Sequence, residues 1–373
     1  MRDAVTSIEN VSLTLGAFAL RDINIALAPG EILVILGPNG AGKSVILETI
    51  AGFHRPSAGR ILIRGRDVTT LPPEERHTGF IFQSFGLFPH LTVAENIAFG
   101  RRRGRNSERL PPFPSASDQV QALIERFALG SLIHRTPADL SPGEKQRVAL
   151  ARSLVAYPDL FLLDEPFSAL DARTSETLRE ELGRFLREAG IPAIFVSHDQ
   201  GDAAMLADRI AVIRDGRLVQ VGTPAEVFGR PANRFVAEFL GMENILRGRI
   251  VAKPQRGRCI VEIAGRTLCV ECDDPPTREA GNIAFCIRAE DIRLRPIDAS
   301  AADVGWDTGA DNRLAGPIVA LTRIGALTRV MQDCGFPLVS YVMSRSVRDL
   351  GLRPGIPIVA EIDPAAIHLV SDA

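Results

Sequence analysis

The chain has 373 residues, 46% of them hydrophobic, and a formal net charge of -2 at pH 7. This length suffices for two or three domains that each bury a core. The near-neutral charge excludes the global basic field with which proteins hold nucleic acid or an anionic membrane, so we expect no nucleic-acid partner. The sequence contains no apolar stretch of 18 or more residues, which predicts a soluble chain without a secretory signal or a transmembrane helix.

The N-terminal region is predicted to form strands that lead into a phosphate-binding loop. Residues 5 to 15 and 20 to 27 alternate apolar and polar positions, which is typical of an antiparallel strand pair. A strand over 31 to 36 is followed by a glycine-rich loop and a helix over 44 to 51. The loop has the spacing G-x-x-x-x-G-K-S and consists of Gly37, Pro38, Asn39, Gly40, Ala41, Gly42, Lys43 and Ser44.

Each residue type of this loop has a task in binding ATP. The glycines let successive backbone N–H groups converge on phosphate oxygens beside a helix N-terminus. We expect Lys43 to reach the β- and γ-phosphates, and the hydroxyl of Ser44 to bind the Mg²⁺ ion that bridges them. The alternative is a plain glycine-rich turn before a buried helix, but strand, loop and helix all fit the context that the motif requires.

The next predicted strand, over 79 to 83, ends in a carboxamide. The side chain of Gln83 can bind the metal, a water or a neighbouring domain, or simply end the strand. From about 84 to 156 the apolar residues recur at helical spacing, which predicts a helical insertion in an α/β domain. Within it, the basic and proline-rich run from 101 to 114 is expected to be a solvated loop, with a lipid or partner contact as the alternative.

A helix start is predicted near the end of this insertion. Ser141 and Glu144 have the spacing of a capping box, and Pro142 falls at the first helical position, where its missing N–H costs nothing. Locally, this is simply a good helix start. The functional interpretation is a second anion site without a nucleotide of its own, formed by the Ser141 hydroxyl, the N–H of Gly143 and the positive helix end.

Two further apolar runs of the buried parallel type end in titratable side chains. The run from 159 to 163 ends at Asp164 and Glu165, and the run from 193 to 197 ends at His198. Strand ends in such sheets face the ligand. We therefore expect Asp164 to hold Mg²⁺ directly or through water, and Glu165 to orient or deprotonate the attacking water. Taken alone, His198 is an ordinary strand-end residue.

From about residue 243 the sequence pattern changes. Short alternating runs broken by Gly and Pro replace the buried strands and helices of the first part. They fall into two sets separated by an acidic link at 301 to 311. The pattern predicts two small all-β barrels in succession, over 240 to 300 and 309 to 373.

Together, residues 5 to 238 resemble the ATPase subunit of ATP-binding-cassette (ABC) transporters, an α/β P-loop NTPase fold with a helical subdomain at about 84 to 156. The elements of that family occur in its order. They are the phosphate loop at 37 to 44, the glutamine loop with Gln83, the signature at 140 to 144, the acidic strand end at 164 and 165, the dimer-contact loop at 168 to 171 and the switch histidine His198.

The resemblance implies a role for each of these residues. Glu165 and His198 would be catalytic, and Ser44, Gln83 and Asp164 would bind the metal. The nucleotide would be held by the phosphate loop and Gln83 of one chain, and by Ser141 and Gly143 of another, in a head-to-tail homodimer. The chain departs from the family at Pro142, where glycine is usual, and at Leu15, where a tyrosine normally stacks on adenine, although Phe18 is close by.

The last 130 or so residues resemble the paired oligonucleotide-binding (OB) fold barrels, of the TOBE or Mop-like type, that follow the ATPase of bacterial and archaeal importers. Three segments are most similar to the molybdate and tungstate branch, at 42 to 48, 203 to 208 and 333 to 338. The resemblance implies a peripheral ATPase at the cytoplasmic face of the membrane, which energises uptake with permease subunits and an extracytoplasmic solute-binding protein. Importers of sulfate, ferric iron, polyamines or sugars remain alternatives, as does a cassette ATPase without a transport function.

In that branch the second barrel can act as an oxyanion sensor, and it usually opens with Ser-Ala-Arg-Asn. This chain has Gly309, Ala310, Asp311 and Asn312 instead, so the hydroxyl is lost and a carboxylate replaces the cation. Arg313, Arg323 and the run from 344 to 346 are the candidates to compensate. We expect the barrel to stabilise the dimer and to bind molybdate weakly or not at all.

Overall fold

The computed structural model describes residues 4–101, 116–255, 257–271, 283–297 and 312–371. Most of the basic, proline-rich run and the residues 309 to 311 lie outside these ranges. The chain divides into two compact units, Met1–Val227 and Phe228–Ala373. No helix among the described residues is long and apolar enough to cross a membrane.

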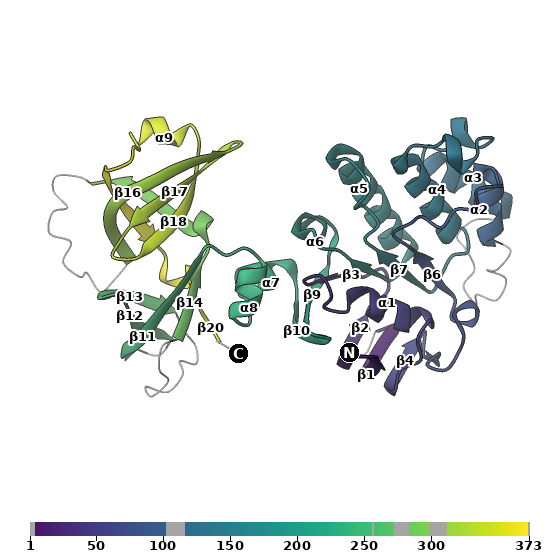
Figure 1. Ribbon diagram of the computed structural model, residues 1–373, viewed down its shortest axis with the longest axis horizontal. Coiled ribbons are helices and arrows are strands. Elements are labelled where there is room, and N and C mark those ends of the chain that lie inside the picture. Colours follow the sequence, from purple (N-terminus) through teal and green to yellow (C-terminus); the bar gives the residue numbers. More distant parts are fainter. Residues whose placement is uncertain (1–3, 102–115, 256, 272–282, 298–311, 372–373) are drawn as a thin grey trace. The chain divides into compact units, whose positions relative to one another are not determined.

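The first unit is built on a six-stranded sheet in the order β10-β9-β3-β8-β7-β6 (Figure 1). The four pairings among β6, β7, β8, β3 and β9 are parallel, and only β10 runs antiparallel. Parallel strands place their carboxyl ends at one edge of a sheet. The bounds are β3 (Ile32–Leu36), β6 (Thr78–Ile81), β7 (Leu160–Asp164), β8 (Ala193–Val196), β9 (Arg209–Arg214) and β10 (Arg217–Gly222).

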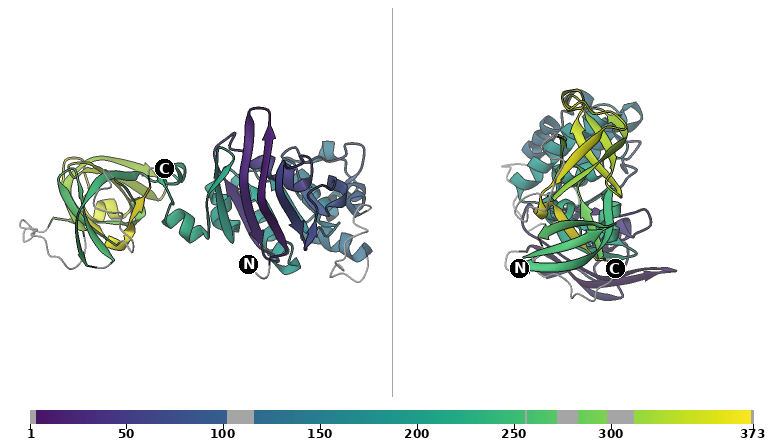
Figure 2. Two further views of the ribbon diagram at one scale, coloured as in Figure 1. Left: turned by 90° about the horizontal axis from the view of Figure 1, so that it is seen from below. Right: turned by 90° about the vertical axis from the view of Figure 1, so that its left-hand side faces the viewer.

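A second, antiparallel sheet covers this one. Its order is β2-β1-β4-β5, with β1 (Thr6–Leu15), β2 (Phe18–Leu27), β4 (Ala58–Ile63) and β5 (Arg66–Asp67). The predicted strand pair is the β1–β2 hairpin, the long purple ribbon in the left view of Figure 2. Apolar residues of this sheet form one core with the helix α1 (Lys43–Ala51) and with alternate residues of β3, β7, β8 and β9.

The helices between the strands of the first unit follow the expected pattern. Between β6 and β7 the described residues form helices, as predicted, and α2 packs on α4. Beyond β7, Asp171 caps the N-terminus of the long helix α5 and Gly190 ends it in a left-handed conformation. The bounds are α2 (Val93–Arg101), α3 (Ala116–Arg126), α4 (Pro142–Leu154), α5 (Ala172–Ala189), α6 (Gln200–Leu206) and α7 (Pro224–Gly229), with 3-10 turns at Pro73–Glu75, Gly130–Leu132 and Pro137–Asp139.

The second unit consists of two five-stranded antiparallel sheets that enclose one core. The first has the order β13-β12-β11-β14-β20 and the second the order β15-β19-β16-β17-β18. The first sheet contains β11 (Asn244–Gln255), β12 (Arg258–Ile263), β13 (Arg266–Glu271), β14 (Ile283–Ile287) and β20 (Ile367–Val370). The second contains β15 (Ile292–Pro296), β16 (Asn312–Ile324), β17 (Leu327–Asp333), β18 (Pro337–Met343) and β19 (Pro357–Ile362). The remaining elements are α8 (Arg234–Phe239), α9 (Ser346–Asp349) and 3-10 turns at Ala289–Asp291 and Pro364–Ala366.

The two sheets exchange one strand each, which differs from two barrels formed in succession. β15 lies in the range predicted for the first barrel but pairs with β19 of the second sheet. Conversely, β20 comes last in the chain and pairs with β14 of the first sheet. Short alternating segments predict strands, but their pairing depends on contacts between distant segments. The all-β character is as expected, and the predicted limits of the two barrels stay a prediction.

A side-chain amide links each sheet to the edge strand of the other. Asn244, the first residue of β11, bonds to both backbone groups of Val339 in β18, at 2.7 and 2.8 Å. Asn312, the first residue of β16, bonds to both backbone groups of Cys269 in β13, at 2.6 and 2.8 Å. Each amide thus satisfies an N–H and a C=O that the edge strand would otherwise leave unpaired.

Candidate functional site

The predicted phosphate loop joins β3 to α1 at the carboxyl edge of the parallel sheet. Gly40 and Gly42 have φ values of 80° and 101°, a conformation that favours glycine. A Cβ at Gly42 would lie 2.3 Å from the ring of Phe18, the first residue of β2, so a larger residue would clash with that strand. Three loop residues are exposed, which leaves the loop open to a ligand: Pro38, Asn39 and Gly40.

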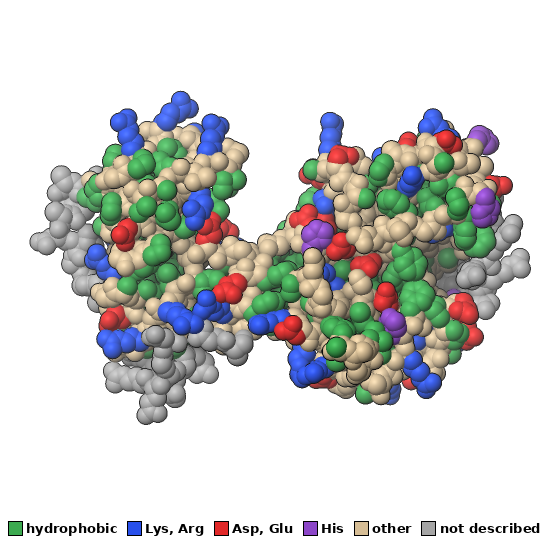
Figure 3. Space-filling view, in the orientation of Figure 1, with side chains coloured by type: hydrophobic (Ala, Val, Ile, Leu, Met, Phe, Trp, Pro, Cys, Tyr) green, Lys and Arg blue, Asp and Glu red, His purple; other side chains and the backbone are tan. Residues whose placement is uncertain are grey.

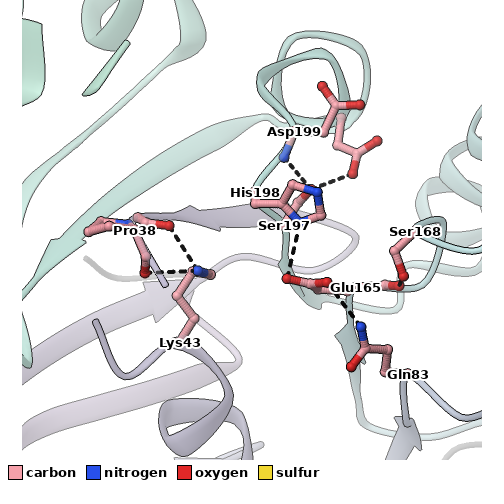
Figure 4. A network of polar contacts seen from close by, with 10 residues as sticks. Pro38, Lys43, Gln83, Glu165, Ser168, Ser197, His198 and Asp199 are labelled. Carbon is pink, nitrogen blue, oxygen red and sulfur yellow. Dashed lines mark hydrogen bonds and ion pairs between the residues drawn. The ribbon is translucent and has the colours of Figure 1, made fainter. Parts of the chain in front are cut away.

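The lysine of the loop is held against the loop backbone. The ammonium of Lys43 donates to the carbonyls of Gly37 and Pro38 at 2.8 and 3.1 Å (Figure 4). Burial lowers the pKa of Lys43, while the nearby carboxylates of Glu165 and Asp164 raise it. The loop thus carries its cation next to the acidic end of β7.

Asp164 ends β7 beside the loop. Burial raises the pKa of its carboxyl group, a hydrogen bond with the Ser44 side chain lowers it, and the carboxylates of Glu165 and Glu48 raise it further. Its Oδ1 atom is buried and has no hydrogen-bond partner in the described part of the chain. A carboxylate oxygen that is buried without a partner costs free energy unless a ligand satisfies it.

The carboxylate of Glu165 lies between two side chains from neighbouring strands. Gln83 Nε2 donates to Glu165 Oε2 at 3.3 Å, and His198 Nδ1 lies 3.1 Å from Glu165 Oε1 (Figure 4). The Glu165 backbone has a φ of 45° and its N–H donates to Val196 at 3.0 Å. A non-glycine residue in this conformation is strained and needs such fixed surroundings. Gln83, Glu165 and His198, which the sequence analysis placed at the ends of three strands, are therefore in contact.

The predicted signature residues lie at the start of α4. The Ser141 hydroxyl accepts from the backbone of Glu144 at 3.4 Å, and the Glu144 carboxylate accepts from the backbone of Ser141 at 2.7 Å, which confirms the capping box. In the described residues, the side chain of Ser141 bonds within this first turn and not to the phosphate loop. A Cβ at Gly143 would lie 3.1 Å from Thr174 of α5. Among the described residues, neither Ser141 nor Gly143 makes a hydrogen bond with the Glu165 cluster of its own chain.

Sequence reasoning missed two features near this site. Phe53, Phe80 and Phe82 form an aromatic cluster beside Gln83, with ring centroids 4.4 to 5.8 Å apart. Phe53 and Phe82 are 46% and 43% exposed, which is unusual for side chains of this size. The second feature is a buried ion pair behind His198, between Arg179 and Asp202. Phenylalanines at 80 and 82 flank Ile81, and this alternation was a sequence signal for the aromatic cluster. No residue spacing in the sequence indicated the ion pair.

The second unit has a basic hollow of about 680 Å³. It contains Arg323, Ser344 and Arg345, which the sequence offered as candidates to bind an anion, together with Thr328, Arg348, Leu321 and Val347. Lys and Arg side chains gather at the end of this unit that carries α9 (Figure 3). The predicted opening segment at 309 to 311 lies outside the described residues.

Comparisons with known proteins identify the family of the chain. The model of the ABC transporter family matches residues 20–168. The molybdate/tungstate import ATP-binding protein WtpC of Pyrococcus horikoshii is 39% identical over 97% of this chain and 99% of its own. The chain belongs to the ABC transporter family. The predicted family and the fold class, a P-loop cassette followed by small all-β OB-like sheets, are therefore confirmed.

Other members of the ABC transporter family are also similar. The sulfate/thiosulfate import ATP-binding protein CysA of Thermosynechococcus vestitus is 41% identical over 83% of this chain and 87% of its own. Among solved structures, cbiO1 of Clostridium perfringens, part of an ABC transporter complex, is 29% identical over 61% of this chain and 91% of that chain, with a TM-score of 0.54. The protein is thus an ABC ATPase that binds ATP.

Proposed function

We propose that this ABC ATPase hydrolyses Mg²⁺-bound ATP as the motor subunit of an oxyanion importer. The observation that carries the chemical part is the position of Glu165, whose two carboxylate oxygens are bound by Gln83 and His198 next to Lys43. A carboxylate so fixed at the edge of a phosphate loop is suited to orient and deprotonate a water that attacks the γ-phosphate.

The residues present fit a magnesium ion. Asp164 offers a buried oxygen that has no hydrogen-bond partner among the described residues, and the Ser44 hydroxyl is bonded to the same side chain. Among the described residues, no group of three or more His, Cys, Asp or Glu side chains is arranged to hold a metal by itself, so the ion would take its other ligands from phosphate and water. Ser44 and Asp164 would hold the ion, with Gln83 nearby, and it would supply charge neutralisation at the phosphates.

The other side chains then have distinct tasks. The loop N–H groups and Lys43 bind and orient the phosphates. Glu165 takes the proton of the attacking water at one carboxylate oxygen. Gln83 and His198 fix that carboxylate from opposite sides, and this fixed geometry is what they contribute.

We further propose that the complete site forms between two copies of the chain. Ser141 and Gly143 lie at the start of α4, and within the described part of the chain Ser141 does not bond to the phosphate loop. In the first turn of this helix of thirteen residues, Pro142 has no N–H and the capping box uses those of Ser141 and Glu144, which leaves the N–H of Gly143 for an anion. In a head-to-tail homodimer this N–H and the Ser141 hydroxyl would contact the γ-phosphate bound by the other copy.

A membrane permease is the proposed partner of the cassette. Phe80 and Phe82 lie within three residues of Gln83, and the ring of Phe53 packs on both of them. Phe53 and Phe82 are exposed. A partner that covers the rings would be linked to the group that bonds to Glu165. Binding there would hold the protein at the cytoplasmic face of the membrane as a peripheral subunit, and a solute-binding protein would act through the permease.

Molybdate or tungstate is the proposed solute. This rests on the WtpC relatives, which match nearly the whole chain, C-terminal unit included. Relatives named for spermidine/putrescine, sulfate/thiosulfate and Fe(3+) import match 79% to 97% of the chain at similar identity. The experiment must therefore compare solutes rather than assume one.

The test is ATP hydrolysis by the protein assembled with its permease in vesicles. We expect binding protein loaded with molybdate or tungstate to accelerate hydrolysis, whereas sulfate, Fe(3+) and spermidine should not, because coupling requires that the loaded state favours the closed dimer. The Glu165→Gln variant is the control for contaminating ATPases. Acceleration by sulfate or spermidine alone would reassign the solute, and hydrolysis indifferent to the permease would refute the importer.

A further inference from the structure

A buried ion pair lies directly behind His198. Arg179, on α5, places its Nε atom 2.5 Å from Oδ1 of Asp202, on α6. The two side chains are only 11% and 8% exposed. Burial raises the pKa of Asp202, while the bonds from Ser197 and Arg179 lower it. Removing two charges from water costs free energy, and replacement of a buried ion pair by apolar residues of similar volume is often neutral or stabilising.

The ion pair is bonded to the turn that carries His198. The Ser197 hydroxyl donates to Oδ2 of Asp202 at 2.5 Å and accepts from the backbone N–H of Asp199 at 2.9 Å. The Asp199 carboxylate lies 3.8 Å from Arg179. The residues on both sides of His198 are therefore anchored, while the imidazole itself is 58% exposed (Figure 4).

Arg179 also contacts the segment that follows Glu165. Its guanidinium lies 5.2 Å from the ring centroid of Phe167, which is buried and stacks on Phe195 of β8. This is within the range of a cation–π contact. One side chain on α5 thus touches both turns whose residues meet in the bond between His198 and Glu165.

We propose that Arg179 is a positioning residue for ATP hydrolysis, which acts through Asp202 and Ser197 to set the distance between His198 and Glu165. The proposal rests on the roles given above to Glu165 and His198. His198 is exposed and has no other anchor of its own among the described contacts, so its place depends on the backbone of the turn. A displacement of about 1 Å in such a constellation can cost about 100-fold in rate.

The experiment is a double-mutant cycle on the ATPase activity of the full chain. Arg179→Met should lower kcat by about 100-fold while KM for ATP changes little, because the phosphate loop is untouched. In a His198→Ala background the same substitution should have almost no further effect, since the residue it positions is gone. Single-turnover hydrolysis with protein in excess over labelled ATP measures the slow variants.

Two further variants separate positioning from stability. Arg187→Met is the control, because Arg187 lies on the same helix and bonds to Asp208 at 3.2 Å and to the last residue of α6, Leu206, at 2.8 Å, but makes no described bond to the turn that carries His198. It should leave kcat unchanged. Arg179→Met combined with Asp202→Leu leaves no uncompensated buried charge, so the melting temperature should recover while kcat stays low.

Each result decides one question. If His198→Ala hydrolyses ATP like the wild type, the proposed role of His198 fails. If His198→Ala is slow but Arg179→Met lowers kcat by the same factor in both backgrounds, Arg179 does not act through His198 and the inference is overturned. Recovery of kcat together with melting temperature in the double variant would likewise show a purely structural ion pair.

Discussion

In the first unit the polar side chains gather at one edge of a parallel sheet, whereas in the second they lie between two antiparallel sheets. β3, β6, β7 and β8 all end at the same edge, which brings Lys43, Gln83, Glu165 and His198 together. In the second unit, Asn244 and Asn312 each bond to an edge strand of the opposite sheet. The same kinds of polar groups therefore serve chemistry in one unit and assembly in the other.

The two units differ in whether their buried polar groups have hydrogen-bond partners. Asp164 keeps a buried oxygen that no described residue bonds, and Glu165 holds a strained backbone, as expected where a ligand completes the site. The two asparagines instead satisfy both backbone groups of the residue they meet. Substitutions at the first kind of position should change activity, and those at the second kind should change stability.

The largest effect is expected at Glu165. Glu165→Gln keeps the shape of the side chain but removes the base, so hydrolysis should slow by about 10²–10⁴-fold while ATP still binds. The closed dimer should then accumulate, which size-exclusion chromatography with and without ATP detects. Wild-type turnover would remove Glu165 from the mechanism.

Asn244→Ala is the corresponding test in the second unit. It leaves the backbone groups of the buried Val339 without partners, which should destabilise that unit by about 2–4 kcal/mol with little change in ATP binding. Asn312→Ala should cost less, because Cys269 is half-exposed and water can replace the amide. Calorimetric unfolding measures both, with the exposed Val319→Ala as control. Equal costs for all three variants would contradict the role of the amides.

Removal of the Lys43 side chain should weaken the binding of ATP and not only slow its hydrolysis. Lys43→Ala deletes a charge-assisted contact worth about 1.5–3 kcal/mol, so the affinity for ATP should fall by about 10–100-fold. Titration with a fluorescent ATP analogue measures it. Because Lys43 bonds to two loop carbonyls, a melting experiment on the same variant checks that the loop itself survives. An unchanged affinity would show that the loop does not use Lys43 as proposed.

The smallest effect concerns Ser141, where stability and chemistry overlap. Ser141→Ala should cost about 1 kcal/mol of stability because the cap of α4 is lost. Ser141→Asp restores the cap but places a negative charge at the proposed anion site. We expect the aspartate variant to melt like the wild type and yet fail to form the ATP-bound dimer. Normal dimerisation by that variant would limit Ser141 to capping.

The sequence by itself determined the cassette and its candidate residues. The phosphate loop, the capping box and the three strand ends are local patterns, and parallel pairing then carries the strand ends to one edge whatever the details of packing. The contacts among Gln83, Glu165 and His198 agree with this expectation. The resemblance to the family, which the comparisons confirm, supplied the roles expected of the motifs.

Only the tertiary structure decided how the strands of the second unit pair, and which groups surround His198. The sequence did contain a signal for the pairing in the second unit. The pattern N-x-L-x-G occurs at 244 to 248 and again at 312 to 316, at the start of β11 and β16. No spacing connects Arg179 with Asp202, because α5 and α6 meet through their packing on the sheet. Periodicity reports which face of an element is buried, whereas the partner of a buried polar group is chosen by segments far apart in the chain.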